Sequence, residues 1–542
     1  MIAWSQHLII LPILLPLLAG TVLLFIADRQ RVVKAMVSLA STIALAAISL
    51  MHVGMIAGQG SFDGVYLLGN WEAPFGIVLV ADRLSAFMVA LTAVLAVPIL
   101  TFSLARWHSA GAHFHSLYQF LLMGLNGAFL TGDLFNLFVF FEVMLASSYG
   151  LVLHGSGPLR VKAGMHYIVV NLAAALLFLI GVSLIYGTAG TLNMADLAER
   201  IPAIEPDRRM LMEAGAAVLG VAFLTKAGMW PLCFWLPSAY SVAAAPVAAI
   251  FTLMSKVGVY IILRLTLLLF SEGPSAGFGS EVLLYGGMAT LVFGTIGVLA
   301  SQALGRIGAY SVLVSSGTLL AVIGLGDAAA TSAALLYLLS STLTLGAFFM
   351  LVELVERSQD AGATVLAVTM EAYGDADDDI PEEVEGVTMP ATLAMLGICF
   401  AACTILLSGL PPLSGFVAKF AMLSALIGTG SIGVPPSGPA LVLVTLVILG
   451  GLATLIALTR AGIRTFWSSI EGTVPRVLVM EIVPVMLILA VTAALAVKAG
   501  PALAYMEATI RTIEKPSLYS GAVRQVVPVP SWRDSRPTQE GD

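Results

Sequence analysis

The chain contains 542 residues, of which 59% are hydrophobic and 11% are charged, and its mean hydropathy is +0.98. A soluble globular domain carries about 25% charged residues, so this composition excludes one and indicates a polytopic membrane protein. The formal net charge of −7 comes largely from one acidic segment and gives no reason to expect binding to nucleic acid.

Apolar runs of about 20 residues, long enough to cross a hydrocarbon core of about 30 Å, recur along the whole chain. They predict an all-α polytopic membrane protein with about fourteen transmembrane helices. In chain order the runs are 8–27, 33–55, 84–105, 114–130, 133–153, 165–186, 212–240, 246–270, 282–304, 307–325, 331–355, 389–428, 440–458 and 477–497. An amphipathic piece at 65–80 lies in the loop after the second run. Runs seven and twelve contain internal prolines, so we expect broken helices there.

Lysine and arginine in short loops predict the orientation of the chain. The basic residues at 28–34, 105–108, 160–162, 306 and 460–476 all fall on one face if the spans alternate as given. This face is therefore predicted to be cytoplasmic.

The two broken runs stand five spans apart, and an odd separation implies opposite topology in the membrane. We therefore expect two inverted five-helix repeats, whose broken helices seven and twelve mark a transport site near the bilayer midplane. The expected parts are helices one to three in 1–110, helices four to eight in 111–270, helices nine to thirteen in 271–460 with an acidic loop at 356–388, helix fourteen in 461–500, and a polar, frayed C-terminal tail in 501–542. The acids lack the register of a calcium loop, so we expect a solvated linker.

Among the ionisable residues inside predicted spans, Glu142, Lys226, Lys256 and Lys419 are the candidates for an ion pathway. A charge at the centre of a spanning helix costs roughly 2.5–3.5 kcal/mol on insertion scales, and such residues commonly mark ion pathways. A glutamate and a lysine brought together stabilise each other's charged form, so opening or closing their contact can load or expel a proton. The alternative is a static bridge between Glu142 and Lys226. The other lysines, and Asp133 at a span entrance, continue a polar line that a bridge would not need.

Five histidines lie near the predicted cytoplasmic ends of spans. His154 and His166, at spans five and six, are the better placed for a proton relay. His108, His113 and His115 cluster in one loop, where they could feed protons or simply belong to a solvated turn.

Span eleven contains the hydroxyl-rich segment SSTLT at 340–344. This segment could carry bound water, or it could serve close helix packing through small residues. No dinucleotide fingerprint, iron–sulfur cysteine run or haem pattern is present in the sequence, and the three cysteines form no metal-ligand pattern. We therefore expect neither a cofactor nor a bound metal.

Three segments together carry a family resemblance: GDLFNLFVFFEVMLASSYGL at 132–151, the run from FLTKAGMWP to SKVGVY at 223–260, and GLPPLSGFVAKF at 409–420. They resemble the antiporter-like, proton-translocating subunits shared by respiratory complex I and the multisubunit Mrp cation/proton antiporters. With GTLNMADLAE at 190–199, the first two segments are most similar to the D subunit of Mrp.

The resemblance implies roles for the intramembrane charges. Glu142 and Lys226 would be the paired glutamate and lysine of the family, Lys256 its central connecting lysine, and Lys419 the terminal charge of the second half-channel.

The sequence also departs from the family at several positions. Where many members have histidines around the first broken helix, this chain has Cys233 and Tyr240, and where many have an HxxFK-like element in span eleven, it has Ser340, Leu343 and Thr344. Hydroxyl groups such as those of Tyr240, Ser340 and Thr344, with water, would have to replace titratable groups in the relay.

The function expected from the resemblance is that of a proton-conducting membrane subunit of a multisubunit Na+ or other monovalent cation/proton antiporter in the bacterial inner membrane, a transporter subunit rather than an enzyme. Its expected partners are other subunits of the assembly, protons, Na+ or another monovalent cation, and the lipid bilayer. Two alternatives stay open: a proton-pumping subunit of an NADH–quinone oxidoreductase-like or related redox complex, and an independent transporter for an organic substrate.

Overall fold

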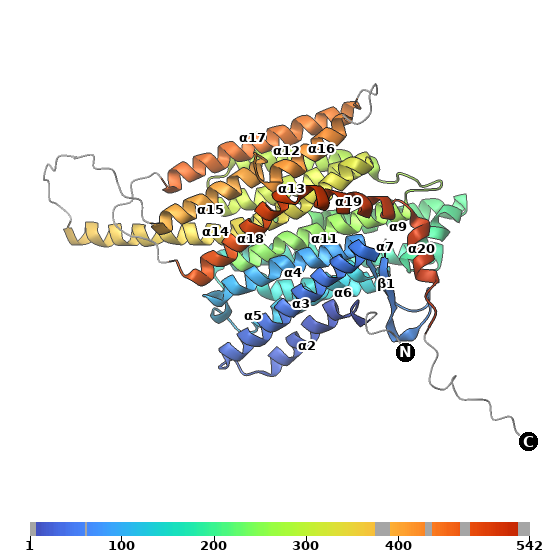
Figure 1. The fold of residues 1–542 in the computed structure, drawn as a ribbon, viewed down its shortest axis with the longest axis horizontal. Coiled ribbons are helices and arrows are strands. Elements are labelled where there is room, and N and C mark those ends of the chain that lie inside the picture. The colour runs from blue at the N-terminus through green and yellow to red at the C-terminus, as the bar shows by residue number, and fades with distance from the viewer. Residues whose placement is uncertain (1–6, 60–61, 374–390, 429–435, 467–476, 529–542) are drawn as a thin grey trace, which may run out of the picture.

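A computed structural model of the chain describes residues 7–59, 62–373, 391–428, 436–466 and 477–528. Within these residues the fold is a bundle of long helices that lie side by side (Figure 1). Helices suit the predicted environment because a helix satisfies its own backbone hydrogen bonds, which lipid cannot do. The prediction of an all-α polytopic membrane protein is confirmed.

Twelve of the described helices are long and apolar enough to cross a membrane. They are α3 (Arg31–Gln59), α4 (Arg83–Leu104), α6 (Leu134–Val152), α7 (Pro158–Ala189), α9 (Pro206–Ala227), α11 (Ala245–Leu269), α12 (Ser280–Ala300), α13 (Leu304–Leu325), α14 (Ala328–Tyr373), α15 (Ala391–Ser408), α17 (Gly438–Phe466) and α18 (Val479–Val497). The two other predicted spans correspond to shorter helices, α2 (Leu11–Phe25) and α5 (Phe114–Leu130). A total of fourteen spans therefore remains a prediction.

Both predicted helix breaks are present. Helix α9 ends at Ala227 and is followed by the short helix α10 (Trp235–Val242), while α15 ends at Ser408 and α16 (Ser414–Ile427) follows. The helix before each break, α9 or α15, is followed by a glycine with a left-handed backbone, Gly228 with φ 77° and Gly409 with φ 80°. A residue with a Cβ adopts this conformation only at an energetic cost. Prolines then prevent the helix from resuming at once.

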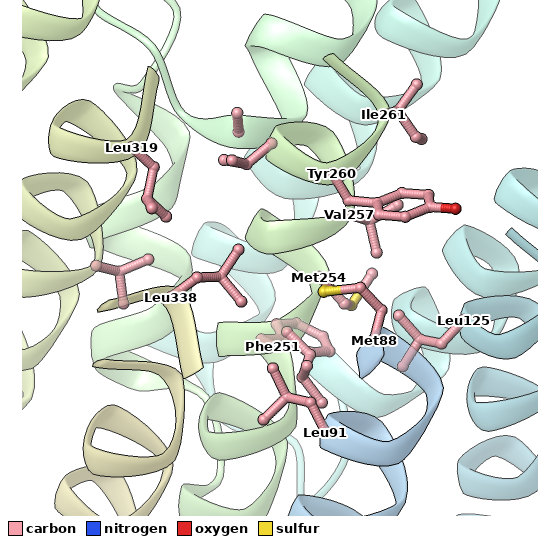
Figure 2. Close-up of a cluster of buried hydrophobic side chains, with 14 of the residues drawn as sticks. Met88, Leu91, Leu125, Phe251, Met254, Val257, Tyr260, Ile261, Leu319 and Leu338 are labelled. Carbon is pink, nitrogen blue, oxygen red and sulfur yellow. The ribbon is translucent and has the colours of Figure 1, made fainter. Parts of the chain in front are cut away.

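Helix α11 occupies the core of the bundle, and nearly all of its side chains are buried. Figure 2 shows Phe251, Met254, Val257 and Tyr260 of this helix among side chains contributed by α4, α5, α13 and α14, namely Met88, Leu91, Leu125, Leu319 and Leu338. A polar residue on α11 must therefore find its partners within the protein.

Glycines let several helices approach closely. A Cβ on Gly181 of α7 would lie 2.7 Å from the backbone nitrogen of Leu219 on α9, and one on Gly258 of α11 would lie 2.7 Å from that of Ala227. Small residues at such positions are how helices pack in membranes. The end of α9 is thereby held between α7 and α11.

The piece at 65–80 that we expected to be amphipathic forms an antiparallel hairpin of β1 (Phe62–Leu67) and β2 (Val78–Asp82), with η1 (Leu68–Asn70) between the strands. Asp82 then begins α4, because its carboxylate accepts a hydrogen bond from the backbone nitrogen of Ser85 while the Ser85 hydroxyl accepts one from that of Asp82. The hairpin and α20 (Pro516–Arg524) lie at the same end of the bundle (Figure 1).

The expected frayed tail from residue 501 was wrong for most of its length. Helix α19 (Ala499–Ile513) buries Met506, Ile510 and Ile513, which recur at helical spacing, and Pro516 begins α20. The polar residues of this region occupy the opposite face of α19, which is amphipathic. The average composition of the segment is therefore polar even though one face of the helix is packed against the protein. Residues 529–542 lie outside the described residues.

The acidic loop expected at 356–388 is also helical in its first part, because α14 continues to Tyr373. Residues 356–373 contain no proline and many good helix formers, so nothing in the sequence stops the helix there. The acids at 375–385 lie outside the described residues, and the linker interpretation stays a prediction.

A buried ion pair joins the hairpin, α11 and the C-terminal helix. The Arg264 guanidinium donates to Asp82 through Nη2 at 2.8 Å and to the Tyr260 hydroxyl through Nε at 2.8 Å, and both charged side chains are at most 5% exposed. The ring of Tyr519 on α20 covers the same guanidinium at 5.6 Å. Helix α20 thus covers a buried ion pair whose two members, Asp82 and Arg264, lie far earlier in the chain.

The remaining short elements lie in the connections between helices. They are η2 (Trp107–Ser109), α8 (Met194–Arg200) and η3 (Ile201–Ala203). Arg524 of α20 makes ion pairs with Asp196 and Glu199 of α8, which fixes α20 against the bundle.

Candidate functional site

Lys226 lies in the last turn of α9, directly before the first break, and is 1% exposed. Its Nζ donates to Asn171 Oδ1 at 3.2 Å and to the Tyr167 hydroxyl at 3.5 Å, both on α7. The same nitrogen lies between 5.4 and 6.0 Å from the ring centres of Tyr167, Phe141 and Trp235. Neutral oxygens and aromatic ring faces therefore surround this cation.

Glu142 on α6 does not touch Lys226. Among the described residues, no carboxylate oxygen lies within 4.0 Å of the Lys226 nitrogen, and Glu142 Oε1 is buried with no hydrogen-bond partner. Helix α6 reaches the lysine by another path, since Ser148 Oγ lies 2.7 Å from the Tyr167 hydroxyl. The static bridge considered from the sequence is therefore absent in this structure.

Lys256 lies in the middle of α11 and is fully buried. Its Nζ donates to Ser315 Oγ at 2.9 Å and to Ser316 Oγ at 3.2 Å, both on α13. Ser315 Oγ is in turn 2.9 Å from Ser341 Oγ on α14. One row of hydrogen bonds thus joins the central lysine to the hydroxyl-rich segment of span eleven.

Lys419 on α16 lies beside the second break. Its Nζ donates to the carbonyl oxygens of Leu407 at 2.9 Å and Ser408 at 3.0 Å, at the carbonyl end of α15, and lies 5.9 Å from the ring centre of Tyr337. A Cβ on Gly409 would lie 2.5 Å from Lys419 Cδ, and the φ of 80° at this position also favours glycine.

The space between Lys256 and Lys419 is bordered by α14. Ser340, next to Ser341 in the chain, places its Oγ 2.9 Å from Ser414 Oγ at the start of α16, the helix that carries Lys419. Tyr337, one turn before Ser341, is the residue whose ring faces Lys419. Helix α14 therefore contacts Lys419 through the Tyr337 ring and reaches Lys256 through the hydroxyls of Ser341 and Ser315.

The structure leaves two predicted relay residues, Thr344 and His154, and Asp133 of the predicted polar line outside this row of contacts. Thr344 donates to the carbonyl of Ser340 in its own helix, and His154 makes its hydrogen bond with the Trp107 carbonyl in a connecting loop. Asp133, taken as part of the polar line, instead caps the start of α6 by accepting from the backbone nitrogens of two residues in its first turn.

Tyr240, another predicted relay residue, is buried on α10 and contacts elements that surround the lysines. Its hydroxyl donates to the Phe251 carbonyl of α11 at 2.7 Å, and its ring centre is 6.1 Å from that of Trp235. It therefore lies between the ring that faces Lys226 and the helix that carries Lys256.

A pocket of about 1000 Å³ opens beside the first break. His166, which is exposed, and Lys162 line it from α7, Arg306 from α13, and Trp235 from α10. Because the Trp235 ring lies 6.0 Å from Lys226 Nζ, the pocket extends from basic residues at the helix ends to the wall beside the lysine.

The sequence reasoning missed Tyr167, Asn171 and Ser315, which hold two of the three lysines. Asn171 is an amide inside an apolar run, and Ser315 belongs to a serine pair in span ten, so both offered a weak signal. Ser341 lay within the 340–344 segment, but its contact with Ser315 depends on how α13 and α14 pack.

Comparison of the sequence with known proteins identifies the family to which this chain is related. A family model described as NADH:quinone oxidoreductase/Mrp antiporter, transmembrane, matches residues 131–434, a range that contains Glu142 and all three buried lysines. The D subunit of a probable K(+)/H(+) antiporter of Rhizobium meliloti is 60% identical over 527 residues, which cover 96% of this chain and 98% of that protein. The D subunit of the Na(+)/H(+) antiporter of Alkalihalophilus pseudofirmus is 33% identical over 534 residues, covering 96% and 99%.

Solved structures share the fold. A chain of the Mrp complex from Dietzia sp. superposes with a TM-score of 0.82 at 24% identity, covering 96% of this chain and all of that one. A chain of respiratory complex I from Thermus thermophilus gives 0.74 at 20% identity, covering 94% and 99%. From the family match and the 60% identical relative together, the chain belongs to the NADH:quinone oxidoreductase/Mrp antiporter transmembrane family, and within it to the group of antiporter D subunits.

Proposed function

We propose that this chain is the proton-conducting membrane subunit of a multisubunit monovalent cation/proton antiporter in the bacterial inner membrane. The observation that carries the proposal is the set of three buried lysines, each held by neutral oxygens. Charges in the membrane interior are costly and are usually retained for ion movement. Relatives named as D subunits of K(+)/H(+) and Na(+)/H(+) antiporters support a transporter subunit rather than an enzyme.

Neutral partners suit a proton carrier. When Lys226, Lys256 or Lys419 gives up its proton, no carboxylate within 4.0 Å is left as an unpaired anion among the described residues. Glu142 acts on Lys226 from a greater distance, and its approach or withdrawal changes how strongly that lysine holds a proton. The pocket that His166 lines supplies the entrance from the predicted cytoplasmic face.

Each of the two proposed repeats contains one broken helix, α9–α10 in the first and α15–α16 in the second. We assign residues 111–270 and 271–460 to two inverted five-helix repeats, with Lys226 before one break and Lys419 after the other. Lys256 then connects the two half-channels, and the hydroxyls of Ser315 and Ser341 carry the proton onward from it.

We expect Ser341→Ala to lower antiport turnover by about 10²-fold, the lower end of the range for a positioned proton-transfer group. The change removes the hydroxyl that meets Ser315 without removing any charge. Ser332→Ala is the matched control, because Ser332 is buried on the same helix and, among the described residues, its hydroxyl donates to the carbonyl of Ala328 alone. Equal activity in both variants would contradict the hydroxyl path.

The function itself is tested in everted membrane vesicles from a strain that lacks its own antiporters and expresses the complete assembly. Respiration first acidifies the vesicles, and a pH-sensitive dye then reports whether K+ or Na+ releases the trapped protons. We expect K+ to be the more effective cation because the 60% identical relative is named as part of a K(+)/H(+) antiporter. No response to either cation, with flavin or iron–sulfur subunits in the purified assembly, would favour the redox-complex alternative.

A further inference from the structure

A second polar pocket, of about 290 Å³, lies away from the lysine line. Its walls are the connection between α2 and α3, the first turn of α3, the connection between α4 and α5, and the first turn of α5. Both connections belong to the face that the basic loops predict to be cytoplasmic. None of the residues that we place in the proton path lines this pocket.

The pocket has surplus positive charge. Lys34 and Asp28 pair at 2.6 Å, and the hydrogen bond from Lys34 holds the pKa of Asp28 below its usual range. The guanidinium of Arg31 makes no hydrogen bond or ion pair with any described residue. Burial, followed by the charge of Arg31, lowers the pKa of His108 on the opposite wall.

The start of α5 adds donors to the same wall. The first N–H groups of a helix have no acceptor within the helix, and here the N-cap residue His113 offers no side-chain cap. The helix dipole makes this end electropositive, and helix α5 is 17 residues long. Phe114, His115 and Ser116, the first three residues of α5, all line the pocket.

Two side chains of this first turn are buried without partners. His115 is 4% exposed and Ser116 is 1% exposed, and among the described residues neither the two His115 ring nitrogens nor Ser116 Oγ has a hydrogen-bond partner. A buried polar group left unsatisfied costs about 1–3 kcal/mol, so two adjacent ones that line one pocket indicate a ligand. The ring of His108 lies 5.8 Å from that of His115, and its Nδ1 is also unpartnered.

We propose that this pocket binds a phosphate group, either as inorganic phosphate or as the headgroup of an anionic phospholipid. A tetrahedral anion can accept from a guanidinium, an imidazole, a hydroxyl and helix N–H groups at once, which are the donors gathered here. A metal ion fits poorly, because Arg31 and Lys34 would repel it and no described group of three or more His, Cys, Asp or Glu side chains could hold one. Basic pockets at the cytoplasmic ends of membrane helices are suited to lipid phosphates.

The test uses the purified, delipidated assembly and two probes, radiolabelled inorganic phosphate in equilibrium dialysis and short-chain phosphatidylglycerol in native mass spectrometry. Arg31→Gln should weaken binding about tenfold or more, and Ser116→Ala about fivefold. Arg29→Gln is the matched control, because Arg29 is an exposed arginine two residues before Arg31 and does not line the pocket. Arg31→Lys should restore part of the binding.

The two probes separate the two sources of phosphate. Binding of inorganic phosphate that depends on Arg31 assigns a free anion, and binding of the lipid alone, with the same dependence, assigns a headgroup. Binding of neither probe, or equal losses in Arg31→Gln and Arg29→Gln, would overturn the proposal. The result does not depend on antiport activity, because binding is measured directly.

Discussion

Lys226→Met should abolish cation-dependent proton exchange while the assembly still forms at near-normal levels. Methionine keeps the length and apolar character of the side chain but cannot carry a proton. The partners that Lys226 leaves behind, Asn171 Oδ1 and the Tyr167 hydroxyl, are neutral, and removing a cation from the membrane interior relieves a cost of roughly 2.5–3.5 kcal/mol. Loss of function should therefore come without loss of protein.

The measurement is dye-reported antiport in everted vesicles, with the amount of assembly determined in the same membranes. Lys498→Met, which removes an exposed lysine at the end of α18, should leave both quantities unchanged. Undiminished antiport in Lys226→Met would exclude Lys226 from the proton path.

Glu142→Gln tests whether Glu142 acts in proton transfer or only forms a structural bridge to Lys226. Because Glu142 and Lys226 make no ion pair within 4.0 Å here, the change should leave thermal stability close to that of the unaltered protein while turnover falls steeply. A variant that is instead lost from the membrane, and recovers both level and activity when Lys226→Met is added, would show that the two residues form a structural bridge.

Asp82→Asn should destabilise the protein by about 3–5 kcal/mol, the usual cost of removing one member of a buried ion pair. Arg264 is 4% exposed and has Asp82 as its acidic partner, so its charge would remain buried without compensation. Asparagine caps a helix about as well as aspartate, so α4 should keep its start and the loss should report the ion pair.

Thermal unfolding of the purified assembly measures this effect. Glu507→Gln, which breaks the exposed pair between Glu507 and Arg511, is the control and should cost only about 0–1 kcal/mol. Adding Arg264→Met to Asp82→Asn should recover much of the stability, because the buried charge is then gone. Equal unfolding temperatures for Asp82→Asn and Glu507→Gln would contradict a stabilising role for the buried pair.

The spans and both helix breaks could be predicted because their causes are local. Twenty apolar residues in a row suffice for a span, and the breaks were indicated by Pro231 and Pro411, each of which lies close after a glycine, Gly228 or Gly409. Charged residues within spans could also be found, since charge is rare there. These signals need no knowledge of which helices are neighbours.

The contacts of the site could not be predicted, because they depend on neighbours far away in the chain. Asn171 reaches Lys226 only because Gly181 lets α7 approach α9, and Ser315 meets Lys256 through the packing of α13 on α11. The C-terminal helices were missed for a different reason. Met506 and Ile510 follow a helical period, but the segment is too short and too polar on average to resemble a span.

The bond between Ser315 and Ser341 has no fixed direction, because either hydroxyl can donate to the other with the oxygens 2.9 Å apart. A proton that moves along this pair from the Lys256 end leaves both O–H bonds reversed. A second proton can follow in the same direction only after both hydroxyls have rotated back. In the proposed proton path, this reset separates successive protons, so that the pair passes them one at a time even when Lys256 already carries the next proton.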